Sequence, residues 1–294
     1  MTDQTDDAEV GISLDDDVER SSVAQAAKLA PKLIYEVIRR DGEEELSRPR
    51  RSLFWSGAAA GVLISFSVVG EAVFRTYLPD AEWAFLLENL GYSLGFILVI
   101  LGRMQLFTEN TITTVLPLML DPRPRMFGRV ARLWAIVLGA NLVGAFAIAT
   151  LYAYSSAIPD ALTPALVSLS EHAVHMPAGQ SFFRAIPAGI LVAAIVWMMP
   201  QAEGSEFWII LTFAWLIAAG DFTHIVAGSV EMAYLAVQGQ LGLFEGMFGF
   251  FLPVLAGNVV GGTAVFTLMA WGQVRDEVTT ETHTKKSASA VRAS

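Results

Sequence analysis

The chain has 294 residues, of which 54% are apolar and 16% are charged, and its mean hydropathy is +0.50. A soluble domain carries about 25% charged residues, so this composition excludes a protein whose whole surface faces water. The net charge of −10 argues against a nucleic-acid partner, and the lack of cysteine excludes disulfides and zinc–thiolate sites. Residues 133–165 contain one charge, Asp160, and residues 246–274 contain none, so we expect a polytopic membrane protein.

The chain begins with an acidic tail. Its first 22 residues hold eight Asp or Glu and one Arg, the opposite of the basic start of a secretory signal, and residues 1–21 are predicted to be disordered. In residues 22–46, apolar side chains recur at helical spacing with Lys and Arg between them. This pattern predicts a basic amphipathic helix on the inner leaflet, with a short soluble helix as the alternative.

Six hydrophobic segments follow in a predicted transmembrane domain, residues 50–275, before a polar tail, residues 276–294, that is predicted to be disordered. The segments are approximately 53–78, 84–120, 130–154, 182–201, 206–238 and 244–273. Lys and Arg gather before the first segment, between the second and third, and after the last, whereas the connections on the other side have none. The positive-inside rule therefore places both termini in the cytoplasm of a multi-pass cell (inner) membrane protein.

Two of these segments are too long for one crossing. Residues 84–120 and 206–238 each exceed 30 residues, whereas a crossing needs about 20. Each is interrupted midway by polar residues, which are Thr108, Glu109, Asn110 and Thr111 in the first and Asp221, Thr223 and His224 in the second. Polar backbone at membrane depth is tolerated where it is buried in protein or lines a cavity, so we predict two broken helices. A long helix that tilts and emerges into solvent is the alternative.

The two halves of the chain resemble each other. Leu106-Phe107-Thr108 precedes Asp221-Phe222-Thr223 by 115 residues, and Gly-Ala-Asn-Leu-Val-Gly at 139–144 precedes Ala-Gly-Asn-Val-Val-Gly at 256–261 by 117. Each half holds three spans, and an odd number requires the second copy to be inserted upside down. The expected fold class is therefore an all-α membrane protein with six transmembrane helices in an inverted 3+3 repeat. Such repeats with broken helices are typical of transporters and channels.

The residues at the two breaks are the candidates for chemistry. His224 is the only histidine predicted inside the membrane. A neutral imidazole both donates and accepts a hydrogen bond, so beside a narrow pore it could hold a permeating anion or pass it a proton. A structural histidine bonded to a freed backbone carbonyl is the alternative. Asp221 and Glu109 are expected to cap half-helix N-termini, with a proton relay as the alternative for both.

Other polar residues receive structural interpretations. Glu71 and Arg75, four residues apart, are expected to form a local ion pair near the end of the first span. Glu231 falls on a helical face similar to that of His224, which makes a place on the outer vestibule an alternative for it. Arg184 is expected at the membrane interface, with the attraction of anions as the alternative. The sequence contains no nucleotide-binding loop, zinc-protease motif or nucleophile–base constellation, so no enzyme, cofactor or metal site is predicted.

Three motifs together resemble the formate/nitrite transporter family over about residues 50–275. They are Gln105–Asn110 with its Leu-Phe-Thr, Gly220–His224 with its final histidine, and Leu252–Gly262 in the last span. The resemblance implies an aquaporin-like channel, assembled in the lipid bilayer as a homopentamer with one pore per protomer for a small solute. It further implies His224 and Thr108 as pore residues, Leu106, Phe107 and Phe96 at an inner constriction, and Ile217 at an outer one.

The resemblance also implies a mechanism, in which a small monovalent weak-acid anion such as formate crosses the apolar constriction in neutral form after protonation. The chain departs from the family in its charges. Formate channels carry a lysine just before the fourth span, where this chain has Ala173 or Pro177, and Thr223 replaces the acidic residue beside the histidine. A pore for a small neutral solute is therefore an alternative, and a non-conducting membrane scaffold or sensor is a second.

Overall fold

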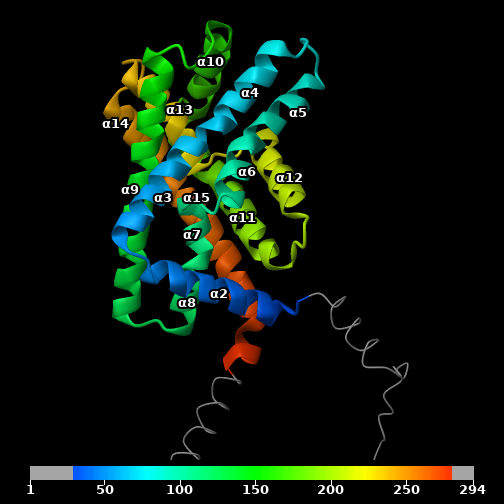
Figure 1. The fold of residues 1–294 in the computed structure, drawn as a ribbon, viewed down its shortest axis with the longest axis vertical. Helices are drawn as coiled ribbons and strands as arrows, with labels where there is room; N and C mark the ends of the chain where they lie inside the picture. Colours follow the sequence, from blue (N-terminus) through cyan, green and yellow to red (C-terminus); the bar gives the residue numbers. More distant parts are fainter. Residues whose placement is uncertain (1–28, 280–294) are drawn as a thin grey trace, which may run out of the picture. The chain divides into compact units, whose positions relative to one another are not determined.

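The computed structural model describes residues 29–279, and across them every regular element is helical (Figure 1). Contacts divide the chain into a unit that ends at Ala30 and a unit that begins at Pro31, and all elements below belong to the second. The predicted acidic tail, the start of the predicted amphipathic helix at residues 22–28, and residues 280–294 lie outside the described residues.

Helix α2 (Pro31–Ser47) lies across one end of the helix bundle (Figure 1). Its apolar side chains at Ile34, Tyr35 and Ile38 are buried, and the Tyr35 hydroxyl donates a hydrogen bond to the Leu116 carbonyl at 3.3 Å. These contacts join α2 to the bundle through α8 (Val115–Leu120). Ile34 and Ile38 of the predicted apolar stripe therefore pack against the bundle, whereas Leu33 and Val37 of the same stripe are exposed.

Five helical segments of the described chain are long and apolar enough to cross a membrane. The first, Arg50–Tyr77, consists of α3 (Arg50–Leu63) and α4 (Ser65–Tyr77), and the second, Ala84–Leu101, consists of α5 (Ala84–Glu88), η1 (Asn89–Tyr92) and α6 (Ser93–Leu101). The third is α9 (Pro124–Tyr154). The fourth, Ala178–Gln201, consists of α11 (Ala178–Met198) and η3 (Met199–Gln201), and the fifth is Leu243–Thr279. The predicted span 206–238 corresponds to two shorter apolar helices, α12 (Glu206–Ala219) and α13 (Ile225–Val237).

The last helix is irregular and longer than predicted. It contains α14 (Leu243–Glu245), α15 (Leu252–Val259) and two π-helical stretches, η4 (Gly246–Phe251) and η5 (Val260–Thr267). The first π-helical stretch ends two residues before Pro253, which supplies no backbone N–H to the turn before it. The helix continues to Thr279, so residues 276–279 of the predicted tail are helical.

Both overlong segments are broken, as predicted. Between α6 and α7 (Phe107–Thr113) the chain runs through residues 102–106, where Arg103 has φ 51°. Between α12 and α13 it runs through residues 220–224, where Asp221 has φ 52°. Positive φ is uncommon for residues other than glycine, so the surrounding structure must hold both turns.

The first break lies slightly earlier than the polar run that signalled it. Thr108, Glu109, Asn110 and Thr111 form the first turn of α7 rather than the interruption itself. Their side chains bond locally, as in the 2.7 Å hydrogen bond from the Thr111 hydroxyl to the Thr108 carbonyl. Thr and Asn side chains bond nearby backbone groups in this way and are common at helix starts, so here they mark the N-terminus of the second half-helix.

The two halves pack their first and third spans in the same way. A Cβ added to Gly144 of α9 would overlap the Ala58 carbonyl of α3, and one added to Gly261 of η5 would overlap the Ile186 carbonyl of α11. Glycine therefore lets the two backbones touch in each pair, as small residues do between transmembrane helices. Helix α10 (Thr163–Val174), preceded by η2 (Asp160–Leu162), lies at the opposite end of the bundle from α2 (Figure 1).

Candidate functional site

The first break is held by an asparagine from the next span. The Asn141 Oδ1 atom accepts a hydrogen bond from the Phe107 backbone N–H at 3.0 Å. Its Nδ2 atom donates to the carbonyls of Gly57 and Gln105, both at 2.8 Å. This one buried side chain caps α7 and ties the interruption to α3 and α9.

The second break has the matching arrangement. The Asn258 Oδ1 atom accepts from the Ile225 backbone N–H at 2.8 Å, and Nδ2 donates to the carbonyls of Ala185 at 2.8 Å and Thr223 at 3.0 Å. The two asparagines lie 117 residues apart, at equivalent positions of the predicted repeat. Our expectation that Asp221 caps a half-helix is wrong, because its side chain bonds Arg184 and His172 and Asn258 accepts the Ile225 N–H instead. The Glu109 carboxyl group bonds the backbone of Leu106, the residue before α7, while Asn141 accepts the Phe107 N–H.

Replacing Asn258 with leucine is expected to destabilise the protein strongly. The variant leaves the buried Ile225 N–H without its partner and removes the bonds to the Thr223 and Ala185 carbonyls, and each buried polar group left unpaired costs about 1–3 kcal/mol. Thermal unfolding in detergent should show a melting temperature several degrees below that of wild type. Leu252→Ala, on an exposed face of the same helix, is the matched control and should change it little. Equal melting temperatures for Asn258→Leu and wild type would contradict the capping role.

The structure brings His224 and Thr108 together from the two breaks. The His224 Nε2 atom lies 2.8 Å from Thr108 Oγ1, although the residues are 116 positions apart. The His224 Nδ1 atom accepts a hydrogen bond from the Ala227 backbone N–H at 3.3 Å, which makes His224 the N-cap of α13. Because Nδ1 is an acceptor, the neutral ring carries its proton on Nε2 and donates it to the Thr108 oxygen. The Thr108 hydroxyl proton is then left to bond a further acceptor.

The same cap opposes a charged ring. A protonated imidazole carries N–H on both nitrogens, so His224 would then direct a donor at the Ala227 N–H and lose the cap. The geometry therefore supports His224 as a neutral hydrogen-bond donor. It disfavours the interpretation in which His224 itself carries a proton to the solute.

Apolar side chains surround this pair. The Phe96 ring is fully buried and packs edge-on against the His224 imidazole, with ring centroids 4.9 Å apart. Leu106 is also fully buried at the start of α7. We call Phe96, Leu106, Thr108 and His224 the buried layer. Of the other predicted constriction residues, Ile217 is buried in α12, and Phe107 packs edge-on against Trp134 of α9 at 5.5 Å.

Two cavities reach the buried layer from opposite ends. The α10-side cavity, of about 230 Å³, is lined by His224 together with residues of α4, α5, η1, α10, α13 and η4. The α2-side cavity, of about 810 Å³, is lined by Leu106 together with residues of α2, α6, α7 and α11. The two linings share no residue, so the buried layer separates them.

Ion pairs occupy the arginines next to the α10-side cavity. Arg75 pairs with Glu88 at 2.7 Å, so the expected pair with Glu71 is wrong, because the acidic partner comes from a neighbouring helix. Arg184 pairs with Asp221, and Asp221 also bonds His172 at 2.9 Å. Both arginines are therefore neutralised by carboxylates.

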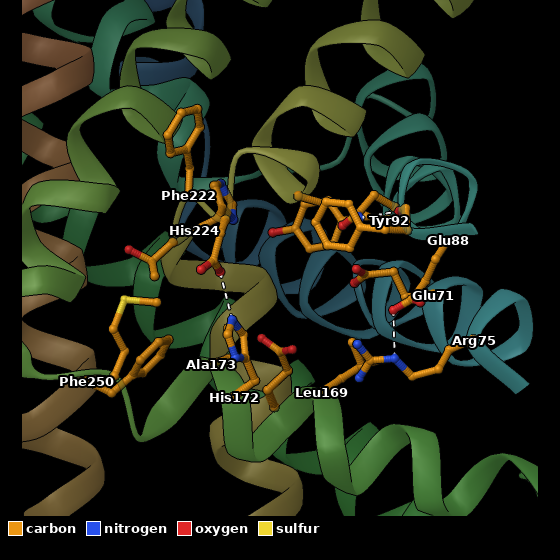
Figure 2. A pocket seen from close by; sticks show the side chains of 18 residues that line it. Glu71, Arg75, Glu88, Tyr92, Leu169, His172, Ala173, Phe222, His224 and Phe250 are labelled. Carbon is orange, nitrogen blue, oxygen red and sulfur yellow. Dashed lines mark hydrogen bonds and ion pairs between the residues drawn. The ribbon is translucent and has the colours of Figure 1, made fainter. Parts of the chain in front are cut away.

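Two carboxylates on this cavity have no such partner. Glu71 of α4 is 7% exposed and Glu231 of α13 is 8% exposed, and both line the α10-side cavity. Neither makes a hydrogen bond or an ion pair with another described residue. Figure 2 shows Glu71, Glu88 and Tyr92 on one side of the cavity and Phe222, His224 and Phe250 on the other.

The α2-side cavity is acidic as well. Asp41, Glu44 and Glu45 of α2 and Glu109 of α7 line it, with Arg48 and Arg103 as its basic residues. Burial raises the pKa of Glu45 above its usual value, although Arg48 lies 2.9 Å away, and burial also raises the pKa of Asp41. Within residues 29–279, no group of three or more His, Cys, Asp or Glu is placed to hold a metal ion.

Comparisons with known proteins point to one family. A family model described as formate/nitrite transporter matches residues 32–272. The inner membrane protein YfdC of Escherichia coli strain K12 is 41% identical over 260 residues, which cover 88% of this chain and 84% of that protein. The formate channel FocA of Haemophilus influenzae is 27% identical over 243 residues, covering 71% of this chain and 82% of that one.

A solved structure has the same fold. A pentameric formate channel with formate bound superposes with a TM-score of 0.66 at 21% sequence identity, covering 77% of this chain and 97% of the channel. The family match runs from α2 into the last helix, so it includes both breaks and both cavities.

Proposed function

This chain belongs to the formate/nitrite transporter family, and on that premise we propose that it moves a small monovalent weak acid such as formate across the inner membrane, with proton coupling. The solute enters one cavity, crosses the buried layer as a neutral molecule and leaves through the other cavity. The observation that carries this proposal is the Thr108–His224 hydrogen bond, which lies between the two cavities and is enclosed by apolar side chains.

The chemistry of the pair suits a carboxylic acid. The acid needs one hydrogen-bond donor and one acceptor, and the His224 Nε2–H and the Thr108 hydroxyl supply both roles. Phe96 and Leu106 have no polar group that could replace the water molecules around an ion. Apolar constrictions exclude ions because of this desolvation cost, whereas a neutral acid loses much less.

Orientation and assembly complete the proposal. The α2 side faces the cytoplasm, where the Lys and Arg clusters place both termini, and α2 is the interfacial helix beside that mouth. The protomers form a homopentamer, which the assembly of the superposed formate channel supports. Each protomer then contains its own pair of cavities.

Purified protein in proteoliposomes should take up formate faster as the external pH falls. The reason is that acid raises the fraction of neutral solute and supplies the coupled proton. Labelled formate uptake at several external pH values measures this, with protein-free liposomes as the control. Formamide, a neutral molecule of similar shape, should cross at a rate that does not depend on pH.

A pore for a neutral solute is the second candidate, favoured by the absence of an unpaired basic side chain on the described lining of the α10-side cavity. Ala173 lines that cavity, and Arg75 and Arg184 are engaged by carboxylates. Formamide flux without formate flux would select this candidate. A lack of flux for both solutes would instead favour a non-conducting scaffold or sensor.

A further inference from the structure

We propose that Glu71 and Glu231 form a proton-loading site in the α10-side cavity, which protonates the weak acid before it enters the buried layer. This inference rests on the proposed function and assigns the source of its proton. The site takes a small carboxylate anion as its ligand and converts that anion to the neutral acid.

The two side chains reach one cavity from different helices. Glu71 extends from α4 and Glu231 from α13, and both are more than nine-tenths buried on the cavity lining. No described residue bonds to either carboxyl group, so their oxygen atoms are available to the cavity contents. Figure 2 shows the Glu71 side chain directed into the cavity on the same side as Tyr92.

The charges around the pair favour a bound proton. Two carboxylates on one cavity of about 230 Å³ repel each other, and burial removes the water that would stabilise them as anions. The single arginine of the described lining, Arg75, is held by Glu88 at 2.7 Å. At least one of the two carboxyl groups therefore keeps a proton while the cavity is empty.

The remaining titratable groups do not replace the pair. The other such groups on the described lining are Arg75, Glu88, Tyr92, His172, Asp221 and His224. Arg75 binds Glu88, and Asp221 binds Arg184 and His172. The elements α3, α6, α7, α9, α15, η2 and η4 also pack against α4 or α13, and they add no charged or titratable side chain to that lining.

The proton transfer is balanced within the cavity. The O–H bond of the protonated glutamic acid breaks, its electron pair stays on the glutamate oxygen, and the proton bonds to a carboxylate oxygen of the solute. The neutral acid moves on to Thr108 and His224, and the glutamate regains a proton from a hydronium ion at the mouth of the cavity, which leaves a water molecule. His224 stays neutral throughout, in agreement with its capping bond to Ala227.

The test is formate and formamide flux through Glu71→Gln, Glu231→Gln and the double variant in proteoliposomes. Glutamine keeps the size and polarity of the side chain but carries no transferable acidic proton. We expect formate uptake by the double variant to fall at least about tenfold, and its remaining rise with external acidity to follow only the fraction of formate that is already neutral in solution. Formamide needs no proton, so its flux should stay within about twofold of wild type and show that the pore is intact. Glu82→Gln, at an exposed position outside the cavity, is the matched control.

The outcomes separate this inference from the proposed function. Wild-type formate uptake and pH dependence in the double variant would overturn the proton-loading site and leave the transport proposal standing. Wild-type protein that carries neither solute would overturn the transport proposal itself. Uptake of methylammonium that depends on Glu71 and Glu231 would also overturn the inference, because the pair would then bind a cation rather than supply a proton.

Discussion

Replacing His224 with asparagine is expected to remove most solute flux while preserving the fold, whereas alanine at the same position should impair both. Asparagine is a favoured N-cap, so it can still accept the Ala227 N–H at the start of α13. It is too short to replace the Nε2 donor that bonds Thr108. Alanine provides neither group and leaves a cavity beside Phe96.

The two His224 variants separate the structural role from the transport role. Formate and formamide flux should fall at least about tenfold in both, because each loses the hydrogen bond offered to the solute. The melting temperature should fall clearly only for His224→Ala, since an N-cap is worth about 1 kcal/mol and the cavity adds to that loss. Wild-type flux in His224→Asn would show that the histidine serves the helix break alone.

Replacing Leu106 with alanine is expected to open the buried layer to ions. Leu106 is fully buried at the first residue before α7 and lines the α2-side cavity. A smaller side chain admits water between the two cavities and lowers the desolvation barrier that excludes charge. Each 1.4 kcal/mol removed from that barrier raises ion flux about tenfold.

Leu116→Ala is the matched control for this second prediction. Leu116 is equally buried in α8 but lines neither cavity. Both variants should lose stability, because a buried Leu→Ala change costs about 2–5 kcal/mol. Only Leu106→Ala should raise the membrane current in planar bilayers. Equal and low currents in both variants would place the ion barrier elsewhere.

The sequence predicted the helical membrane fold because its signals are local. Hydrophobic runs of span length need no knowledge of contacts, and the excess length of residues 84–120 and 206–238 indicated two breaks. The exact position of the first break was harder to predict from the sequence. Polar residues mark both interruptions and first helical turns, and Thr108 lies in the first turn of α7.

The site was predictable only in part, because its contacts cross the fold. The breaks drew attention to Thr108 and His224, and the structure places them in hydrogen-bond contact. The repeat contained both capping asparagines, but only the folded chain shows what each one bonds. The partner of Arg75 could not be predicted for the same reason, because Glu88 lies on another helix whereas Glu71 is one turn away on the same helix. The positions of two residues in the sequence do not show which of several carboxylates an arginine will pair with.

The paired asparagines have a consequence for biogenesis. All hydrogen-bond partners of Asn141 precede it in the chain, at Gly57, Gln105 and Phe107, so the first break can be completed before later spans are synthesised. Asn258 likewise bonds only to residues of its own half. Each half can thus leave the translocon with the backbone groups at its break already hydrogen-bonded. The nascent chain then does not expose an uncapped helix end to lipid before the other half is inserted.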